Sequence, residues 1–196
     1  MDGAVLRAMA KWPNVPAVYG WLSLDRRGRW LIRGEQMTNR AALEFICRNY
    51  AADADGRWYF QNGPQRVFVS LDYAPWVLRL RPDGGLDTHT GAPVHAPQQA
   101  YVDEQGNLLI AFESGIGLVE DRDLEALSDL IGGADGAPMQ PEQVVQALSA
   151  LAGGEESSMT LRLGGTLLAI AHLQQVRVPT RFGFDPSPGD PGLRSE

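Results

Sequence analysis

The stretch LDRRGRWLI, residues 24–32, has a close counterpart in VDEQGNLLI, residues 102–110. Each stretch is an apolar residue, then Asp-x-x-Gly, then an apolar run, which is typical of two strands joined by a glycine turn. The order of the elements that follow each stretch is also shared: hairpin, helix, hairpin, strand. We therefore predict an α+β fold of two similar, duplicated units with a cleft between them. Chance similarity between common Asp-x-x-Gly hairpins stays open as the alternative.

The first α+β unit is predicted over residues 20–81. Thr38 or Asn39 caps a helix whose buried face carries apolar side chains three or four positions apart: Leu43, Ile46, Cys47 and Tyr50. The pair Asn62-Gly63 favours a tight turn, which predicts a hairpin between RWYFQ and QRVFVSL. The run WVLRLR that follows is predicted to be the last strand of this unit.

The rest of the chain divides by composition. Residues 1–19 are predicted to be an arm laid on the fold, and the Gly- and Pro-rich residues 82–98 a connector. The second unit is predicted over residues 99–182, with Pro141 in the first turn of a helix. Residues 183–196 are predicted to be a disordered tail.

Composition and charge exclude several classes of protein. The net charge is −7 with a pI near 5.0, which argues against nonspecific nucleic-acid binding, because that binding depends on neutralising phosphates. The charge is uneven, +3 over residues 1–98 and −10 over the rest, which indicates complementary halves or unevenly solvated surfaces. With one cysteine, no signal peptide and no apolar run near the roughly 20 residues of a membrane span, we expect a soluble cytoplasmic protein.

The sequence contains no familiar catalytic signature. There is no Gly-x-Ser-x-Gly elbow and no Walker loop, and the pair Gly115 and Gly117 lacks the third glycine of a dinucleotide-binding loop. Cys47 lies on an apolar helix face and is expected to be buried. His89 and His95 are expected to be solvated loop residues rather than metal ligands. No cofactor is implied, and enzymatic activity is the less favoured reading.

The best candidate site is the stretch LDYAPWVLRL, residues 71–80. Asp72, Tyr73 and Trp76 surround a proline at the entry to a strand, where their side chains would point in fixed directions. They could bind a ligand that stacks on a ring and donates a hydrogen bond to the carboxylate. They could equally form a corner in which Tyr73 and Asp72 hold the backbone. Both interpretations stay open.

Four further residues complete the candidate site. Arg40 in the first turn of a helix and Arg66 on a strand could clamp a carboxylate or phosphate in a bidentate manner. Glu113 and Ser114 follow the first hairpin of the second unit, at the place that residues 35–36 take in the first. The ligand expected for this site is a small anionic or aromatic molecule.

Three longer runs resemble a known family: GRWLIRGEQMTNRAALEFI, DGRWYFQNGPQRVFVSLDYAPWVLRL and NLLIAFESGIGLVEDRDLEAL. They are similar to a bacterial domain-of-unknown-function family that structural genomics described as a new fold with two repeated motifs. Residues 73–76 stand for that family's acidic aromatic corner, and residues 112–117 for its second motif, which here lacks the Asn and the terminal Asp. The resemblance covers roughly residues 20–178 and implies a role in ligand sensing or signal transduction.

Three functions follow from these residues. The first is a module that binds or senses a small anionic or aromatic molecule. The second is an interaction protein whose exposed aromatic residues form a homodimer or another partner surface. The third is an enzyme that uses carboxylates such as Asp72 and Glu113 as acid and base.

Overall fold

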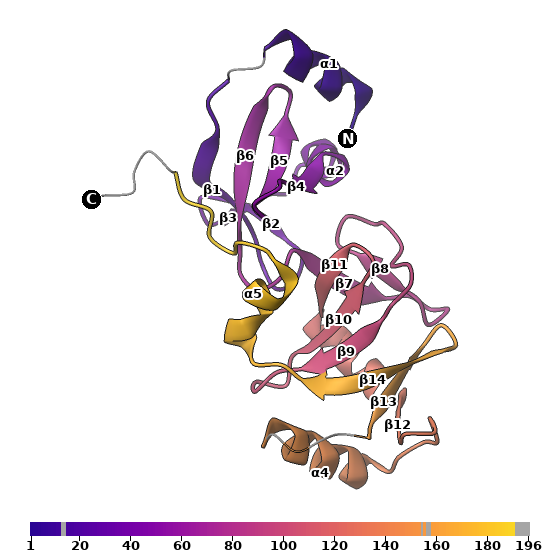
Figure 1. Ribbon diagram of the computed structural model, residues 1–196. Helices are drawn as coiled ribbons and strands as arrows, with labels where there is room; N and C mark the ends of the chain where they lie inside the picture. Colours follow the sequence, from indigo (N-terminus) through magenta and orange to yellow (C-terminus); the bar gives the residue numbers. More distant parts are fainter. Residues whose placement is uncertain (13–14, 154, 156–157, 191–196) are drawn as a thin grey trace, which may run out of the picture. The chain divides into compact units, whose positions relative to one another are not determined.

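The computed structural model describes residues 1–12, 15–153, 155 and 158–190 of the chain (Figure 1). It is an α+β fold, as predicted, that separates into two compact units. Unit 1 is Met1–Pro75 together with the segment that begins at Gly183, and unit 2 is Trp76–Phe182. The chain therefore returns to unit 1 after completing unit 2.

Unit 1 contains one sheet whose strands run in the order β3-β2-β1-β6-β5-β4. The central pair, β1 and β6, is parallel, and every other pair is antiparallel. Helix α2 joins the two halves of the sheet. The elements are α1 (Gly3–Lys11), β1 (Val18–Leu24), β2 (Trp30–Ile32), β3 (Glu35–Gln36), α2 (Arg40–Arg48), β4 (Tyr50–Ala52), β5 (Trp58–Asn62) and β6 (Gln65–Leu71).

Unit 2 contains a larger sheet in the order β12-β13-β14-β9-β10-β11-β7-β8. Its parallel pairs are β14 with β9 and β11 with β7. The elements are β7 (Trp76–Leu80), β8 (Leu86–Thr88), β9 (Gln99–Val102), β10 (Leu108–Phe112), β11 (Gly115–Val119), η1 (Asp121–Asp123), α3 (Leu124–Ser128), β12 (Ile131–Gly132), α4 (Pro141–Ala152), β13 (Thr160–Leu163), β14 (Thr166–His172), η2 (Gln175–Arg177) and α5 (Val178–Phe182).

The two units repeat one topology. The order β4-β5-β6-β1-β2-β3 in unit 1 matches β12-β13-β14-β9-β10-β11 in unit 2, with α2 and α3 at the same point of the chain. The register also matches, because Leu24 pairs with Leu71 across the parallel strands of unit 1 as Val102 pairs with His172 in unit 2. The two similar units predicted from residues 24–32 and 102–110 are therefore confirmed.

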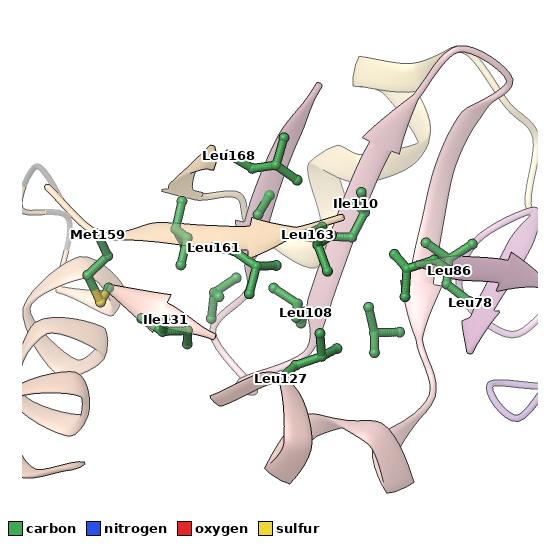
Figure 2. Packing of buried hydrophobic residues seen from close by; sticks show 14 of the residues in the cluster. Leu78, Leu86, Leu108, Ile110, Leu127, Ile131, Met159, Leu161, Leu163 and Leu168 are labelled. Carbon is green, nitrogen blue, oxygen red and sulfur yellow. The ribbon is translucent and has the colours of Figure 1, made fainter. Parts of the chain in front are cut away.

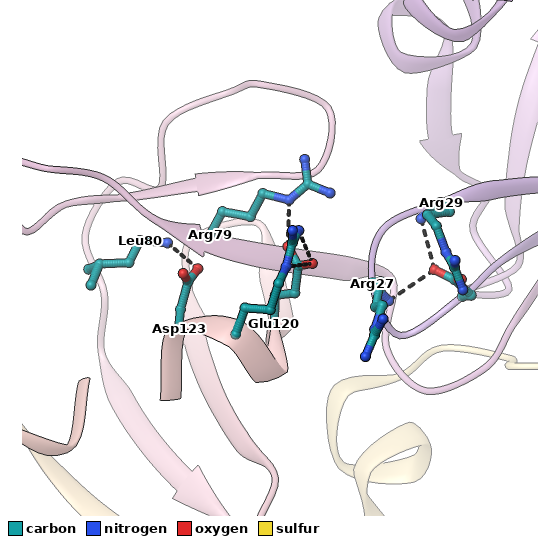
Figure 3. Close-up of polar contacts among 8 residues, drawn as sticks. Arg27, Arg29, Arg79, Leu80, Glu120 and Asp123 are labelled. Atoms are coloured by element: carbon teal, nitrogen blue, oxygen red, sulfur yellow. Dashed lines mark hydrogen bonds and ion pairs between the residues drawn. The ribbon is translucent and has the colours of Figure 1, made fainter. Parts of the chain in front are cut away.

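The Asp-x-x-Gly turns explain why that short motif marked the repeat. Asp25 Oδ1 accepts hydrogen bonds from the backbone N–H groups two and four residues later, at 2.9 and 2.8 Å (Figure 3). Asp103 Oδ1 does the same at 2.8 and 2.9 Å, and Asp53 begins a third such turn between β4 and β5. The glycine at the fourth position of each turn has φ between 72° and 80°, a conformation that glycine adopts without strain.

Two insertions distinguish unit 2 from unit 1. Strands β7 and β8 extend its sheet beyond β11, whereas β3, the equivalent of β11, is the edge of the sheet in unit 1. Helix α4 lies between β12 and β13, where unit 1 has only the turn that begins at Asp53. Pro141 begins α4 as predicted, and Asn39 caps α2 by accepting a hydrogen bond from the N–H of Ala42 (3.0 Å).

Several predicted boundaries differ from the structure. WVLRLR was assigned to the first unit, residues 20–81, but β7 pairs with β11 and belongs to unit 2. The predicted connector, residues 82–98, contains β8, because residues 86–88 pair back onto β7. The predicted arm contains helix α1, in which Val5 is buried. The hairpin after β5 turns at residues 63–64 rather than at Asn62, which pairs with the first residue of β6.

The tail expected to be disordered from Gly183 has defined contacts up to Asp190, and residues 191–196 lie outside the described part. Phe184 is buried, and the N–H of Leu71 donates to the carbonyl of Pro186 (2.8 Å). Asp185 forms a parallel bridge with Arg57 of unit 1. Burial of Phe184 explains the order, because an aromatic side chain removed from water offsets the entropy lost by a short segment.

Candidate functional site

Unit 1 holds an apolar cavity of about 570 Å³ between its sheet and helix α2. This volume lies within the range of small-molecule sites. Asn62 and Gln65 are the polar residues of a lining that is otherwise apolar or aromatic. The lining residues are Val18, Trp21, Leu22, Ile32, Met37, Ala42, Phe45, Ile46, Phe60, Asn62, Gln65 and Val67.

The equivalent face of unit 2 is more tightly packed, and its hollows are smaller: about 340 Å³ beside α3 and α4, and about 200 Å³ beside Leu86 and Leu163. Ile32 pairs with Leu22 of β1, and Ile110 pairs with Ala100 of β9. These two partners lie at equivalent positions of their strands, so Ile32 and Ile110 are equivalent residues. Ile32 is 43% exposed, whereas Ile110 is 0% exposed. The same registers align Asn62, which is exposed, with Leu163, which is buried. Figure 2 shows Ile110 and Leu163 inside the packed core of unit 2.

Strands β7 and β8 and the loop after them supply the side chains that close this face. Leu78 and Leu86 are buried in the same cluster as Ile110 and Leu163 (Figure 2). Val94 packs against that cluster. Among the described residues of unit 1, no strand extends the sheet beyond β3. The cavity of unit 1 therefore lies where β7, β8 and the following loop would cover the sheet in unit 2.

Buried polar contacts hold β7 in this closing position. Glu120 is 2% exposed at the end of β11 and accepts hydrogen bonds from Arg79 on β7 and from Arg122, both at 2.8 Å (Figure 3). The N–H of Leu80 donates to Asp123 Oδ2 at 2.8 Å. These contacts fix the register of β7 on β11, and with it the position of the leucines that fill the face.

The loop after β8 also encloses a histidine that the sequence placed in solvent. His89 Nδ1 accepts a hydrogen bond from the N–H of Val77 (3.3 Å), and its Nε2 is buried. Desolvation, with a smaller contribution from the positive charge of Arg79, lowers the pKa of His89 to about 3. The imidazole is thus neutral near pH 7, and its Nδ1 acts as a hydrogen-bond acceptor for the backbone of β7. Among the described residues, no group of three or more His, Cys, Asp or Glu could hold a metal ion.

The mouth of the unit 1 cavity, marked by the half-exposed lining residue Trp21, has a positive charge beside it from Arg33, which is not itself a lining residue. Trp21 is 50% exposed, and the Arg33 guanidinium lies over its ring, 3.9 Å from the centroid. Arg33 and Gly34 form the turn between β2 and β3 with φ values of 52° and 84°, the pattern of a type I′ hairpin turn. A positive φ is uncommon for arginine and costs about 1 kcal/mol, so a strained residue stands at this mouth.

Two of the predicted site residues form a corner of unit 1. Tyr73 is buried, and the Arg26 guanidinium lies 4.9 Å from its ring centroid. The N–H of Asp72 donates to the carbonyl of Leu24 (3.0 Å). Partial desolvation and repulsion from Asp25 raise the pKa of the Asp72 carboxyl, which the charge of Arg26 opposes.

Unit 2 repeats this corner. The N–H of Leu173 donates to the carbonyl of Val102 (3.1 Å), at the positions equivalent to Asp72 and Leu24. Glu104, equivalent to Arg26, accepts a hydrogen bond from the N–H of Gln175 (3.0 Å). A contact that recurs in both units belongs to the shared fold, which favours the structural interpretation of LDYAPWVLRL.

The other predicted residues have local partners. Arg40 is 91% exposed at its side chain and forms an ion pair with Glu44 at 2.8 Å, which raises its pKa. The Arg66 guanidinium lies over the ring of Tyr59, on the face of the sheet opposite the cavity. Neither arginine lines the cavity.

Trp76 and Ser114 do meet in unit 2. The Trp76 indole N–H donates to the carbonyl of Ser114 at 3.0 Å, and the ring lies near Phe112. Glu113 and Ser114 form the turn between β10 and β11, the position that residues 33–34 take in unit 1. Ligand binding by the seven predicted residues stays a prediction, with four of them in unit 1 and three in unit 2.

Sequence reasoning missed Trp21, Ile32 and Arg33 as candidate site residues. One difference between the halves was visible in chain order: residues 76–98, which precede the second repeat, form β7 and β8, whereas the residues that precede the first repeat contain helix α1.

Comparisons with known proteins agree with the fold. The model of the family DUF2944, described as "Protein of unknown function (DUF2946)", matches residues 1–189. The crystal structure of a DUF1285 family protein from Silicibacter pomeroyi DSS-3 is 16% identical with a TM-score of 0.51, over 90% of this chain and 97% of that one. A second DUF1285 family protein, from Shewanella baltica OS155, is 14% identical with a TM-score of 0.41, over 54% and 88%.

None of the curated proteins matches the chain. The likeness to the Silicibacter protein concerns the fold alone, because the identity is low. Within the described residues, no helix has both the length and the apolar character needed to cross a membrane. The family match extends over nearly the whole chain and confirms the resemblance to an uncharacterised domain family; the chain belongs to the family described as "Protein of unknown function (DUF2946)".

Proposed function

We propose that the protein is a small-molecule binding module and that the ligand occupies the apolar cavity of unit 1. One observation carries this proposal: leucines pack over the equivalents of Ile32 and Asn62 in unit 2, whereas unit 1 is open there over about 570 Å³, against about 340 and 200 Å³ for the hollows on that face of unit 2. An open apolar face costs free energy in water, and an apolar ligand would recover it. A sensing role would follow if ligand binding changes the stability of unit 1.

A thermal-shift screen with a cavity-filling variant tests this proposal. We expect apolar or aromatic metabolites to raise the melting temperature, since a ligand at 100 times its Kd stabilises by about 2.7 kcal/mol. Ala42→Phe, on the cavity side of α2, should remove that shift by filling the space. Ala41→Phe is the matched control, because Ala41 is exposed on the same helix and does not line the cavity. Shifts that persist in Ala42→Phe would contradict the proposal.

A partner surface is the second candidate function. Trp21 and Ile32 are 50% and 43% exposed and line the same cavity, so a second copy of the chain could cover them. This function predicts a concentration-dependent mass in sedimentation equilibrium that Trp21→Ser abolishes. A monomer at every concentration would exclude a homodimer at this face.

A further inference from the structure

We infer that the ligand of unit 1 is a carboxylate with an aromatic or aliphatic body, whose anionic end is bound by Arg33 at the mouth of the cavity. This inference rests on the proposed function and names the class of ligand for the same cavity. It depends on three observations: the shape of the apolar lining, the charge at the mouth and the strained backbone that places that charge.

The lining of the cavity determines which apolar group of a ligand can fit inside it. Phe45 and Phe60 meet edge to face, with ring centroids 5.5 Å apart, on the wall formed by α2 and β5. Ile32 and Met37 form the opposite part of the lining, on and after strands β2 and β3. A flat or aliphatic group fits such walls, and its burial would supply most of the binding free energy.

The positive charge at the mouth indicates that the polar end of the ligand is anionic. Arg33 forms no ion pair with any carboxylate of the described residues, like Arg7, Arg26 and Arg66 of the same unit, whereas Arg29, Arg40, Arg48 and Arg57 each form at least one. Its guanidinium carbon lies 3.9 Å from the centroid of the Trp21 ring, which places the charge beside a residue of the cavity lining. A carboxylate matches the N–H edge of a guanidinium in a bidentate manner.

The backbone at Arg33 is the third observation. Asparagine and glycine are the residues that suit the first central position of a type I′ turn, yet arginine occupies it here with φ of 52°. The turn lets Ile32 pair with Glu35, the N–H of Arg33 donates to the carbonyl of Trp21 (2.8 Å), and the side chain adds the contact with the Trp21 ring. A residue kept at a strained position beside an open cavity points to a role in binding.

The experiment compares two probes of one shape, 2-naphthoate and the neutral alcohol 2-naphthalenemethanol, by isothermal titration calorimetry on the full chain. We expect the carboxylate to bind the wild type about tenfold more tightly at low ionic strength, since a charge-assisted pair is stronger than a neutral one. Raising the salt concentration should reduce this preference, because the mouth is open to solvent.

Two variants decide which arginine is responsible. Arg33→Asn should abolish the preference while leaving the affinity for the alcohol unchanged, and it should fold well because asparagine tolerates positive φ. Arg40→Gln should keep the preference, since Arg40 is exposed and paired with Glu44. A wild type that binds both probes equally would overturn the inference, and so would a preference that survives in Arg33→Asn.

The outcomes separate this inference from the proposed function. If the alcohol binds and Ala42→Phe removes its binding, the cavity is a ligand site whatever the carboxylate does. If neither probe binds, the inference is overturned, and the proposed function is decided by the wider screen.

Discussion

Replacing Ile110 with alanine is expected to lower the free energy of unfolding by about 4 kcal/mol. Ile110 is 0% exposed in the core of unit 2, where Leu78, Leu86 and Leu163 pack in the same cluster, so the removed atoms leave a cavity (Figure 2). Chemical denaturation of the full chain measures the change in the free energy of unfolding. Protection of the unit 2 amides from hydrogen exchange shows whether the loss is in that unit.

The matched variant is Ile32→Ala at the equivalent position of unit 1. Ile32 is 43% exposed beside a space that is already open, so we expect a loss of about 1 kcal/mol or less. Equal losses for the two variants would contradict the claim that one face is filled and the other is open. A larger loss for Ile32→Ala would mean that unit 1 covers this face by itself.

Replacing Gly56 with alanine is expected to lower the free energy of unfolding by about 3–5 kcal/mol. Gly56 has φ of 75°, which costs an alanine about 1–2 kcal/mol. A Cβ there would lie 2.0 Å from the carbonyl oxygen of Gly183, so the returning segment would have to move. Moving it would expose Phe184, whose burial is worth about 1.5–3 kcal/mol.

The turn at Gly106 provides the control, because it has the same Asp-x-x-Gly form. Gly106 has φ of 80°, but a Cβ there would meet nothing within 4 Å. Gly106→Ala should therefore cost only the backbone term, about 1–2 kcal/mol. Limited proteolysis near residue 183 reports release of the returning segment. Resistance of Gly56→Ala to cleavage would contradict the account of how that segment docks.

The repeat could be predicted from the sequence because its signal is local. An Asp-x-x-Gly turn needs an acceptor side chain at its first position and a glycine at its fourth, so the motif survives in both units at Asp25 and Asp103. The same holds for Asn39 and Pro141, whose roles at helix starts depend on their immediate neighbours.

The cavity could not be predicted because it depends on pairing between distant strands. WVLRLR follows the first unit directly in the chain, which favoured placing it there, but its partner β11 lies about 40 residues later. Once β7 joins unit 2, the first sheet ends at β3 and its apolar face stays open. The residues of the aromatic corner at Tyr73 are adjacent in sequence, whereas Trp21 and Phe60 come together in the cavity lining only in the fold.

The claim that unit 1 is open for a ligand can be tested directly by methyl NMR of isoleucine during titration with 2-naphthoate. Of the six isoleucines in the chain, Ile32 and Ile46 line the unit 1 cavity, while Ile110 and Ile131 lie in the core of unit 2. We predict that the methyl signals of Ile32 and Ile46 move in a saturable manner and that those of Ile110 and Ile131 do not. Saturable movement confined to the isoleucines of unit 2, or none at Ile32 and Ile46, would contradict the account.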